Sequence, residues 1–308
     1  EWQRKIETIA ASVQASLNLE DGPLWSVAYF DLGSNRPGRL LFVVHHLAVD
    51  GISWHPLLED LETAYQQLKA GHAVQPPPKT FSYKAWAEEL QEFANTDSLR
   101  KEMSYWRTVT EPLHLPGVLG PLEVDGASAK NTEGAAATVK VSLTAGETDA
   151  LLHQVPAAYN TKINDVLLTA LARAWAQWSG SRVLFTNLEG HGRENLFEDA
   201  DLSRTVGWFT SIFPVRLQMP ETGPDWQPGE VLKSIKEQLR QIPQRGIGFA
   251  ILRYLRADSG LSARAEPPMV FNYLGQFDQV LAGSKLFRFA PESTGPWHSS
   301  KQRRRHAL

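Results

Sequence analysis

The chain changes character near its middle, and this change limits the folds that are open to it. A stretch rich in Pro, Gly, Ser and Asp covers residues 112–134 and separates two regions in which expected strands and helices alternate. Segments of this composition are typical of connections between domains. Alternating strands and helices are typical of α/β folds, in which helices cover a sheet. We therefore predict an α/β fold with mixed sheets in two lobes, residues 1–130 and 131–308.

Hydrophobic periodicity predicts the elements of the first lobe. Apolar residues recur at helical spacing in several segments, and shorter apolar runs bounded by turn residues mark two strands. The continuous apolar run at residues 40–44 predicts a strand that is buried on both faces. The expected helices cover residues 1–19, 52–69, 83–93 and 98–109, and the expected strands cover residues 24–31 and 39–46.

The second lobe opens with an expected strand and a helix whose first residue is a recognisable cap. Thr144 stands three residues before Glu147, which is the spacing of a capping box. The helix expected at residues 166–178 is apolar on nearly all sides, so we predict a core helix capped by Asn164 or Asp165. A further helix is expected at residues 229–241, and strands are expected at 136–143, 182–188, 206–217 and 269–273.

Composition excludes several classes of protein. Hydrophobic residues make up 42% of the chain and charged residues 21%, which are ordinary values for a globular protein. The formal net charge of −3 argues against a nucleic-acid binder, and we expect the basic run at residues 301–305 to be a solvated terminus. No apolar stretch reaches the ~20 residues that cross a bilayer. Because Cys is absent, disulfides and Cys-ligated zinc are excluded, and we expect a cytoplasmic protein. The first residue is Glu1 rather than Met, which predicts a piece of a longer protein.

The densest group of chemically active side chains lies at residues 45–51, with the sequence HHLAVDG, between an expected strand and an expected helix. Neighbouring side chains on a strand point to opposite faces, so only one of His45 and His46 faces a given cavity. This argues against a metal site that uses both histidines. Asp50 falls in the turn, where its carboxylate can hold an arginine or orient a histidine. The structural alternative is a packed core histidine, with Asp50 capping the following helix.

This segment resembles the HHxxxDG signature of the condensation-domain superfamily of nonribosomal peptide synthetases. Further segments match the motifs of the epimerization domains in that superfamily, in the same order. They are GISW at 51–54, EGHGRE at 189–194, RTVGWFT at 204–210, PQRGIGF at 243–249, with Phe249 in place of a tyrosine, and FNYLG at 271–275. The chain therefore resembles an epimerization domain, with the family's first motif missing upstream and the C-terminal end truncated.

The resemblance implies a fold, a substrate and partners. It implies two lobes similar to chloramphenicol acetyltransferase, with an active-site tunnel between them, for which Trp208 and Phe209 are candidate lining residues. The implied substrate is an aminoacyl or peptidyl thioester on the phosphopantetheine arm of an upstream carrier domain, and the implied reaction inverts its α-carbon. A downstream condensation domain is the second implied partner. No cofactor or metal of the protein's own is implied.

Inversion needs a base for a weakly acidic α-proton, a proton donor on the opposite face and stabilisation of the enolate. His46 is the candidate for one face, because histidine titrates near the working pH. The resemblance assigns the other face to Glu189. A surface carboxylate in a glycine-flanked turn is the structural alternative for Glu189, and His191 competes for the role.

Other residues are predicted to support this pair. Asn272 and Tyr273 carry groups that donate hydrogen bonds to an enolate oxygen, with packing at a strand edge as the structural alternative. His45 is a supporting residue beside the catalytic histidine. The superfamily pairs the aspartate of its first signature with an arginine of the second lobe. Arg216 occupies the matching place, so we predict a structural salt bridge between Asp50 and Arg216.

Rival functions share part of this pattern. The main alternative is a condensation domain, which uses His46 to form an amide bond between two carrier-bound substrates. A catalytically silent member that recruits a partner protein and a free acyltransferase that acts on coenzyme A are the others. Gly246 and Gly248 do not form a G-x-G-x-x-G sequence after a strand, which argues against nucleotide binding.

Overall fold

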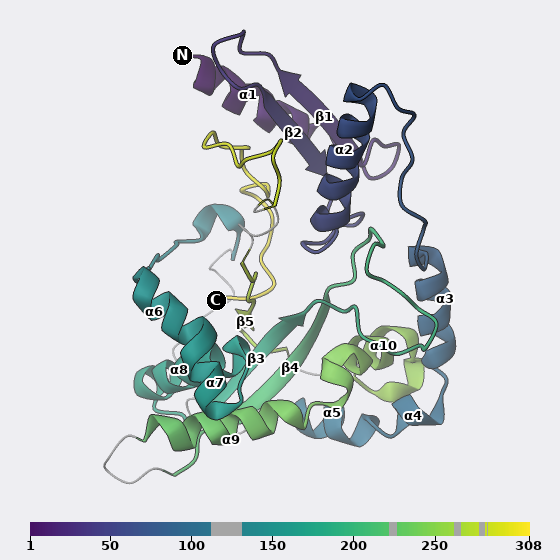
Figure 1. Cartoon of the computed structure of the whole chain (residues 1–308). Coiled ribbons are helices and arrows are strands. Elements are labelled where there is room, and N and C mark those ends of the chain that lie inside the picture. Colours follow the sequence, from purple (N-terminus) through teal and green to yellow (C-terminus); the bar gives the residue numbers. More distant parts are fainter. Residues whose placement is uncertain (112–130, 222–226, 262–265, 277–280, 282) are drawn as a thin grey trace. The chain divides into compact units, whose positions relative to one another are not determined.

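The computed structural model describes residues 1–111, 131–221, 227–261, 266–276, 281 and 283–308 (Figure 1). Contacts between residues divide it into two units. The first unit comprises Glu1–Ala87, Asn195–Thr210 and Leu274–Ser299, and the second comprises Glu88–Glu194, Ser211–Tyr273 and Ser300–Leu308. Both units are therefore discontinuous in sequence. The segment just before the predicted lobe boundary at residue 130 lies outside the described residues, so that boundary stays a prediction.

The first unit is built on an antiparallel pair of strands covered by a helix. Its elements are α1 (Trp2–Ala15), β1 (Trp25–Phe30), β2 (Arg39–Val44), α2 (Trp54–Lys69) and the start of α3 (Tyr83–Phe93). The two strands pair from Trp25 opposite Val44 to Phe30 opposite Arg39. The helix α1 runs along this pair and buries Ile6 and Ala10, which stand one turn apart (Figure 1).

The prediction that residues 40–44 form a strand buried on both faces is wrong. Within β2 only Leu41 is buried, and Leu40 is 39% exposed. Trp25 and Tyr29 on β1 are 63% and 68% exposed. The physical reason is that α1 covers only one face of this pair, which is the only sheet of the described part of the first unit.

The second unit contains a mixed sheet. Its strands β3 (Val183–Gly190), β4 (Ser211–Gln218) and β5 (Val270–Phe271) lie in the order β4-β3-β5. The central strand pairs antiparallel with β4 and parallel with β5. The predicted α/β fold with mixed sheets is thereby confirmed.

Helices cover the sheet of the second unit and bury its central strand. The α-helices are α4 (Asp97–Arg100), α5 (Met103–Val109), α6 (Ala145–Asp149), α7 (Val155–Tyr159), α8 (Ile163–Ser179), α9 (Pro228–Arg240) and α10 (Ile247–Leu255). A π-helical turn at Ala150–Gln154 joins α6 to α7, and short 3-10 turns occupy Glu133–Ala135, Pro243–Gly246 and Ala257–Ser259. Because α8 packs on β3, and α5, α9 and α10 pack on β4, six consecutive residues of β3 are buried.

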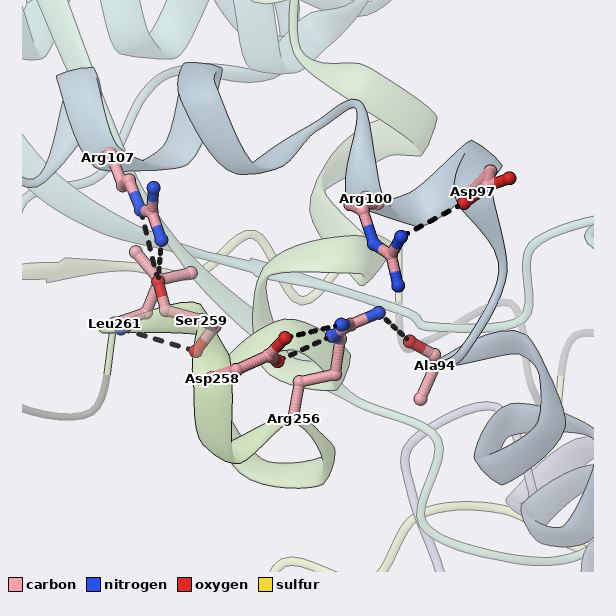
Figure 2. Close-up of polar contacts among 8 residues, drawn as sticks. All are labelled: Ala94, Asp97, Arg100, Arg107, Arg256, Asp258, Ser259 and Leu261. Atoms are coloured by element: carbon pink, nitrogen blue, oxygen red, sulfur yellow. Dashed lines mark hydrogen bonds and ion pairs between the residues drawn. The ribbon is translucent and has the colours of Figure 1, made fainter.

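Arginine side chains fasten the segment after α10 to α5 and to Ala94, the residue that follows α3 (Figure 2). Arg256, itself buried, donates two hydrogen bonds of 2.9 and 2.7 Å to the Asp258 carboxylate and one of 3.2 Å to the carbonyl oxygen of Ala94. Arg107 on α5 donates two more, of 3.1 and 2.9 Å, to the carbonyl oxygen of Ser259. These bonds hold α10 in place, and β4 packs against that helix.

Most predicted helices are confirmed, and the differences from prediction have local causes. The helix at 83–93 is found with those bounds, and Thr144 forms the predicted capping box with Glu147. The helix predicted at 98–109 is two helices, α4 and α5. The cap of α8 is Lys162 rather than Asn164 or Asp165, because Asp165 stands at the third helical position and accepts a hydrogen bond from the Lys162 amide.

One strand prediction for the second lobe is wrong, and another is correct only in part. The segment 136–143 has no strand pairing, and Val139 and Val141 are 89% and 87% exposed. Alternating β-branched residues favour an extended strand, but a strand also needs a hydrogen-bonding neighbour. The strand predicted at 206–217 begins only at Ser211, because residues up to Thr210 belong to the first unit.

The basic C-terminal run is not a freely solvated terminus. The amide of Ala307 donates to the carbonyl oxygen of Pro268 at 2.7 Å, and the amide of Val270 donates to that of Leu308 at 3.0 Å. Arg305 pairs with Glu266, and this pairing lowers the pKa of the Glu266 carboxyl group. The positive charge of Arg305 therefore pairs with the partly buried carboxylate of Glu266. Among the described residues, no helix is both long enough and apolar enough to span a membrane.

Candidate functional site

The HHLAVDG segment forms a tight turn directly after β2. The last strand-like bond joins the His45 amide to the carbonyl oxygen of Leu24 at 2.8 Å, after which the chain folds back on itself. The Nδ1 atom of His45 accepts a hydrogen bond of 3.1 Å from the Leu47 amide. His45 is half-buried, and His46 is exposed. Because both histidines lie beyond the strand, the turn and not strand alternation sets their directions.

Asp50 is the buried anchor of this turn. Asp50 is only 4% exposed. Its Oδ1 atom accepts hydrogen bonds from the Ser53 amide at 2.8 Å and from the Ser53 hydroxyl at 2.7 Å. Ser53 directly precedes α2, so Asp50 stabilises the start of that helix. Both oxygens of the carboxylate are used, because Oδ2 accepts a bond of 3.2 Å from the Phe209 amide.

The RTVGWFT segment closes over the same turn, although it lies about 150 residues further along the chain. The Gly207 amide donates a hydrogen bond of 3.2 Å to the Ser53 hydroxyl oxygen, which also lies 3.1 Å from the Gly207 carbonyl oxygen. Arg204 donates to the carboxylates of Glu59 and Asp60 on α2. The HHLAVDG and RTVGWFT segments therefore form one substructure within the first unit.

Trp208 and Phe209, both predicted as lining residues, have different environments. The Trp208 ring lies against the His46 ring, with centroids 5.1 Å apart and planes tilted by 49°. Phe209 is buried and packs against the rings of Tyr83 and Trp86. Trp208 is thus placed beside the candidate catalytic histidine, whereas Phe209 is a core residue of the first unit.

The residues of the predicted salt bridge each have partners within their own unit. Arg216 on β4 donates hydrogen bonds to the carbonyl oxygens of Val109 at 2.9 Å and Glu111 at 2.6 Å. Burial lowers the pKa of this guanidinium. Asp50 is satisfied by backbone and hydroxyl donors of the first unit, as described above. The ion pair between Asp50 and Arg216 stays a prediction.

Glu189 and Asn272 are brought together by the parallel pairing of β3 with β5. Leu188 stands opposite Phe271 in that pairing, so the next residues on each strand are Glu189 and Asn272. The side-chain amide of Asn272 donates a hydrogen bond to Oε2 of Glu189. Glu189 is half-buried, and Tyr273 beyond it is also half-buried. Two sequence motifs separated by 83 residues thus contribute to one polar pair.

His191 takes part in a different set of contacts. Its Nδ1 accepts a hydrogen bond of 3.0 Å from the Arg193 amide, and its Nε2 lies 3.4 Å from Oε1 of Glu194. Glu194 also lies 3.3 Å from the Arg245 guanidinium. Of the two residues that compete for the second catalytic role, Glu189 is the one that the structure joins to Asn272.

The glycines of the PQRGIGF segment serve close packing. Gly246 has φ +90°, and an added Cβ would lie 2.2 Å from the ring of Phe213. At Gly248 an added Cβ would lie 2.2 Å from Oε2 of Glu102. Glu102 is buried, accepts a hydrogen bond of 3.0 Å from the Trp106 indole, and has its pKa raised by burial. This motif therefore fixes α10 against α5.

One pair near Glu189 was missed by sequence reasoning. Asn187 is 4% exposed, stands two residues before Glu189 on β3, and lies 2.8 Å from Nε2 of His306. Burial and the charges of Arg305 and Arg304 lower the pKa of His306. An amide among the buried residues of a strand is a signal for such a partner, but the sequence does not say which residue supplies it. Within the described residues, no group of three or more His, Asp or Glu is arranged to hold a metal ion.

Comparisons with known proteins agree on one family. The condensation domain family matches residues 1–301. Linear gramicidin synthase subunits B and C of Brevibacillus parabrevis are 48% and 51% identical over 99% and 96% of this chain, which spans only 6% and 4% of those relatives. The solved epimerization domain from the third module of tyrocidine synthetase B is 37% identical, with a TM-score of 0.87 over 99% of this chain and 67% of that one. The predicted resemblance to epimerization domains of nonribosomal peptide synthetases is confirmed.

Proposed function

Because this chain belongs to the condensation domain family, we propose that it inverts the α-carbon of an aminoacyl or peptidyl thioester. The thioester is carried on the phosphopantetheine arm of a carrier domain. The reaction interconverts its L and D forms. The observation that carries the proposal is the hydrogen bond from Asn272 to Glu189. It joins two segments whose sequences both match epimerization domains, in a chain that is similar throughout to a solved epimerization domain.

The proposed chemistry assigns the two proton transfers to two different residues. His46 removes or supplies the α-proton on one face, and Glu189 does so on the other. Asn272 keeps one carboxylate oxygen of Glu189 hydrogen-bonded, which orients the group. The Asn272 amide and the Tyr273 phenol are also the donors proposed to stabilise the enolate oxygen. In each direction, one residue accepts the α-proton and the other donates a proton to the opposite face. The two residues therefore exchange roles when the reaction runs in reverse.

The proposal includes partners and a location. The substrate arrives on an upstream carrier domain, and the product passes to the condensation domain of the next module. The protein needs no cofactor of its own, because the thioester already acidifies the α-carbon. The synthetase that contains this domain works in the cytoplasm.

Condensation is the second candidate, since the matched family bears that name and the His46 turn is the segment both activities share. In that reaction His46 promotes attack of an amine on a carrier-bound thioester, and Glu189 has no assigned step. The proposed role of Glu189 therefore distinguishes the two functions.

The test is to load a carrier domain with an L-aminoacyl thioester and incubate it with the chain in deuterated water. Deuterium at the α-carbon together with racemisation supports epimerization. Amide product with an acceptor-loaded carrier, without isotope exchange, contradicts it and indicates condensation. His46→Gln and Glu189→Gln are both expected to lower exchange by at least about a hundredfold, and a variant that keeps the full exchange rate removes that residue from the mechanism.

A further inference from the structure

Tyr83, the first residue of α3, contacts the loop that touches His46. Its hydroxyl donates a hydrogen bond of 2.8 Å to the carbonyl oxygen of Trp208. Its ring meets the Phe209 ring edge to face, with centroids 5.0 Å apart. An added Cβ at Gly207 would lie 2.3 Å from Cδ2 of Tyr83, so this ring lies directly on the backbone of Gly207. One tyrosine thus touches three consecutive residues of the RTVGWFT segment.

These contacts bear on His46 because Trp208 stands between Tyr83 and the imidazole. The Trp208 ring is 5.1 Å from that of His46, and Trp208 is 38% exposed, so burial alone does not fix the indole. Its backbone is fixed on both sides, by the bonds of Gly207 with Ser53 and of the Phe209 amide with Asp50. The Tyr83 hydroxyl holds the carbonyl of Trp208 itself.

We propose that Tyr83 is a positioning residue that holds the Trp208 indole against His46. The kinetic consequence of this proposal rests on the proposed epimerase function, whereas the contact itself does not. Tyrosine suits the place, because its hydroxyl donates to the carbonyl while its ring packs on a residue without a side chain. Burial and the charge of Asp50 raise the pKa of Tyr83, so the phenol keeps its proton and remains a donor.

The opposing explanation is that Tyr83 only fills space under the loop. Tyr83→Phe separates the two explanations, because it keeps the ring and removes only the hydroxyl. Tyr65→Phe on α2 is the matched control, since Tyr65 is 45% exposed and Tyr83 is 40% exposed. Thermal unfolding of both variants verifies that the fold is retained.

The first measurement is the NMR signal of the His46 ring in the histidine-labelled chain. The signal is assigned by its loss in His46→Gln, and Trp208→Leu gives its position without the indole ring current. We expect Tyr83→Phe to move the signal toward the Trp208→Leu position, while Tyr65→Phe leaves it unchanged. A His46 signal that is identical in Tyr83→Phe and in the unsubstituted chain overturns the proposal.

The second measurement is α-proton exchange in a double-mutant cycle. We expect Tyr83→Phe to lower kcat about fivefold with KM unchanged, as loss of one hydrogen bond predicts. In the Trp208→Leu background the same change has no further effect, because Tyr83 acts only through Trp208. Equal losses in the two backgrounds overturn the proposal. If the unsubstituted chain shows no exchange at all, the proposed function fails, and the NMR measurement alone decides whether Tyr83 positions His46.

Discussion

The turn that carries His46 and the strand end that carries Glu189 are held in different ways. Around His46, one buried carboxylate, Asp50, bonds donors from Ser53 and Phe209. Around Glu189, the partner Asn272 is placed by a parallel strand of only two residues, Val270 and Phe271. The first site is fixed by a network inside the turn. The second depends on the docking of a distant, short strand, which makes its geometry more sensitive to changes elsewhere.

The largest expected effect is on the rate of α-proton exchange when Glu189, near the end of β3, is replaced. Glu189→Gln keeps the size of the side chain but removes its capacity to exchange a proton, so we expect exchange to fall roughly 10²–10⁴-fold. The free energy of unfolding should change by less than about 0.5 kcal/mol, because the group is half-buried and not a core residue. Isotope exchange and chemical denaturation measure the two quantities. Glu20→Gln, at an exposed position, is the control, and a Glu189→Gln chain of undiminished rate refutes the assignment.

Asp50→Ala tests the opposite region, where stability and activity should fall together. Removing the carboxylate leaves the amides of Ser53 and Phe209 without their acceptor inside the fold. At roughly 1–3 kcal/mol for each stranded buried group, we expect a loss of about 3 kcal/mol in the free energy of unfolding. Chemical denaturation measures this loss, with Asp21→Ala at an exposed position as control. A fully stable but slow Asp50→Ala protein would instead indicate a chemical role for this carboxylate.

A smaller, pH-dependent effect is expected at His306, the partner of Asn187 on β3. Burial lowers the pKa of His306 in the folded protein, so the unfolded chain binds the proton more readily. The stability contribution of neutral His306 is therefore fully present above its ordinary value of 6.5 and is lost as the pH falls through and below that value. We expect His306→Gln to flatten this part of the stability-against-pH curve, measured by denaturation between pH 5 and 8.

The same variant sharpens the comparison between the two sites. Asn187, the partner of His306, lies on β3 two residues before Glu189, so a change there should lower α-proton exchange modestly, by about threefold. His298→Gln, at an exposed position, serves as the control. If His306→Gln leaves both the pH dependence and the exchange rate as they were, the dependence of the Glu189 site on its strand neighbours is refuted.

The smallest effect is expected at Arg204, which pairs with Glu59 and Asp60 on α2. Exposed ion pairs contribute little, and the Glu59 side chain is 66% exposed. We expect Arg204→Lys to cost about 0.5 kcal/mol in unfolding free energy and to leave exchange nearly unchanged. A loss as large as that of Asp50→Ala would show that the ion pair, rather than the buried carboxylate, fixes the His46 turn.

Local rules predicted the elements whose causes are local. The helix at 83–93 and the capping box at Thr144 follow from residues a few positions apart, and both were found as predicted. The strand at 136–143 failed because alternation sets a preference for extended backbone, while a partner strand decides whether it pairs. The basic run at 301–305 was misjudged for a similar reason, since its carboxylate partner Glu266 is remote in sequence.

The sequence by itself determined the family and the mixed α/β fold, and it singled out His46, Glu189 and Asn272 as residues of interest. These follow from motif spacing and from periodicities that each short segment carries alone. Only the tertiary structure decided that Asn272 bonds Glu189 and that Ser53 bonds Gly207, across 83 and 154 residues of chain. The physical reason is that a hydrogen bond or a ring contact is fixed by distances in space, and these arise only when strand pairing and helix packing have brought remote segments together.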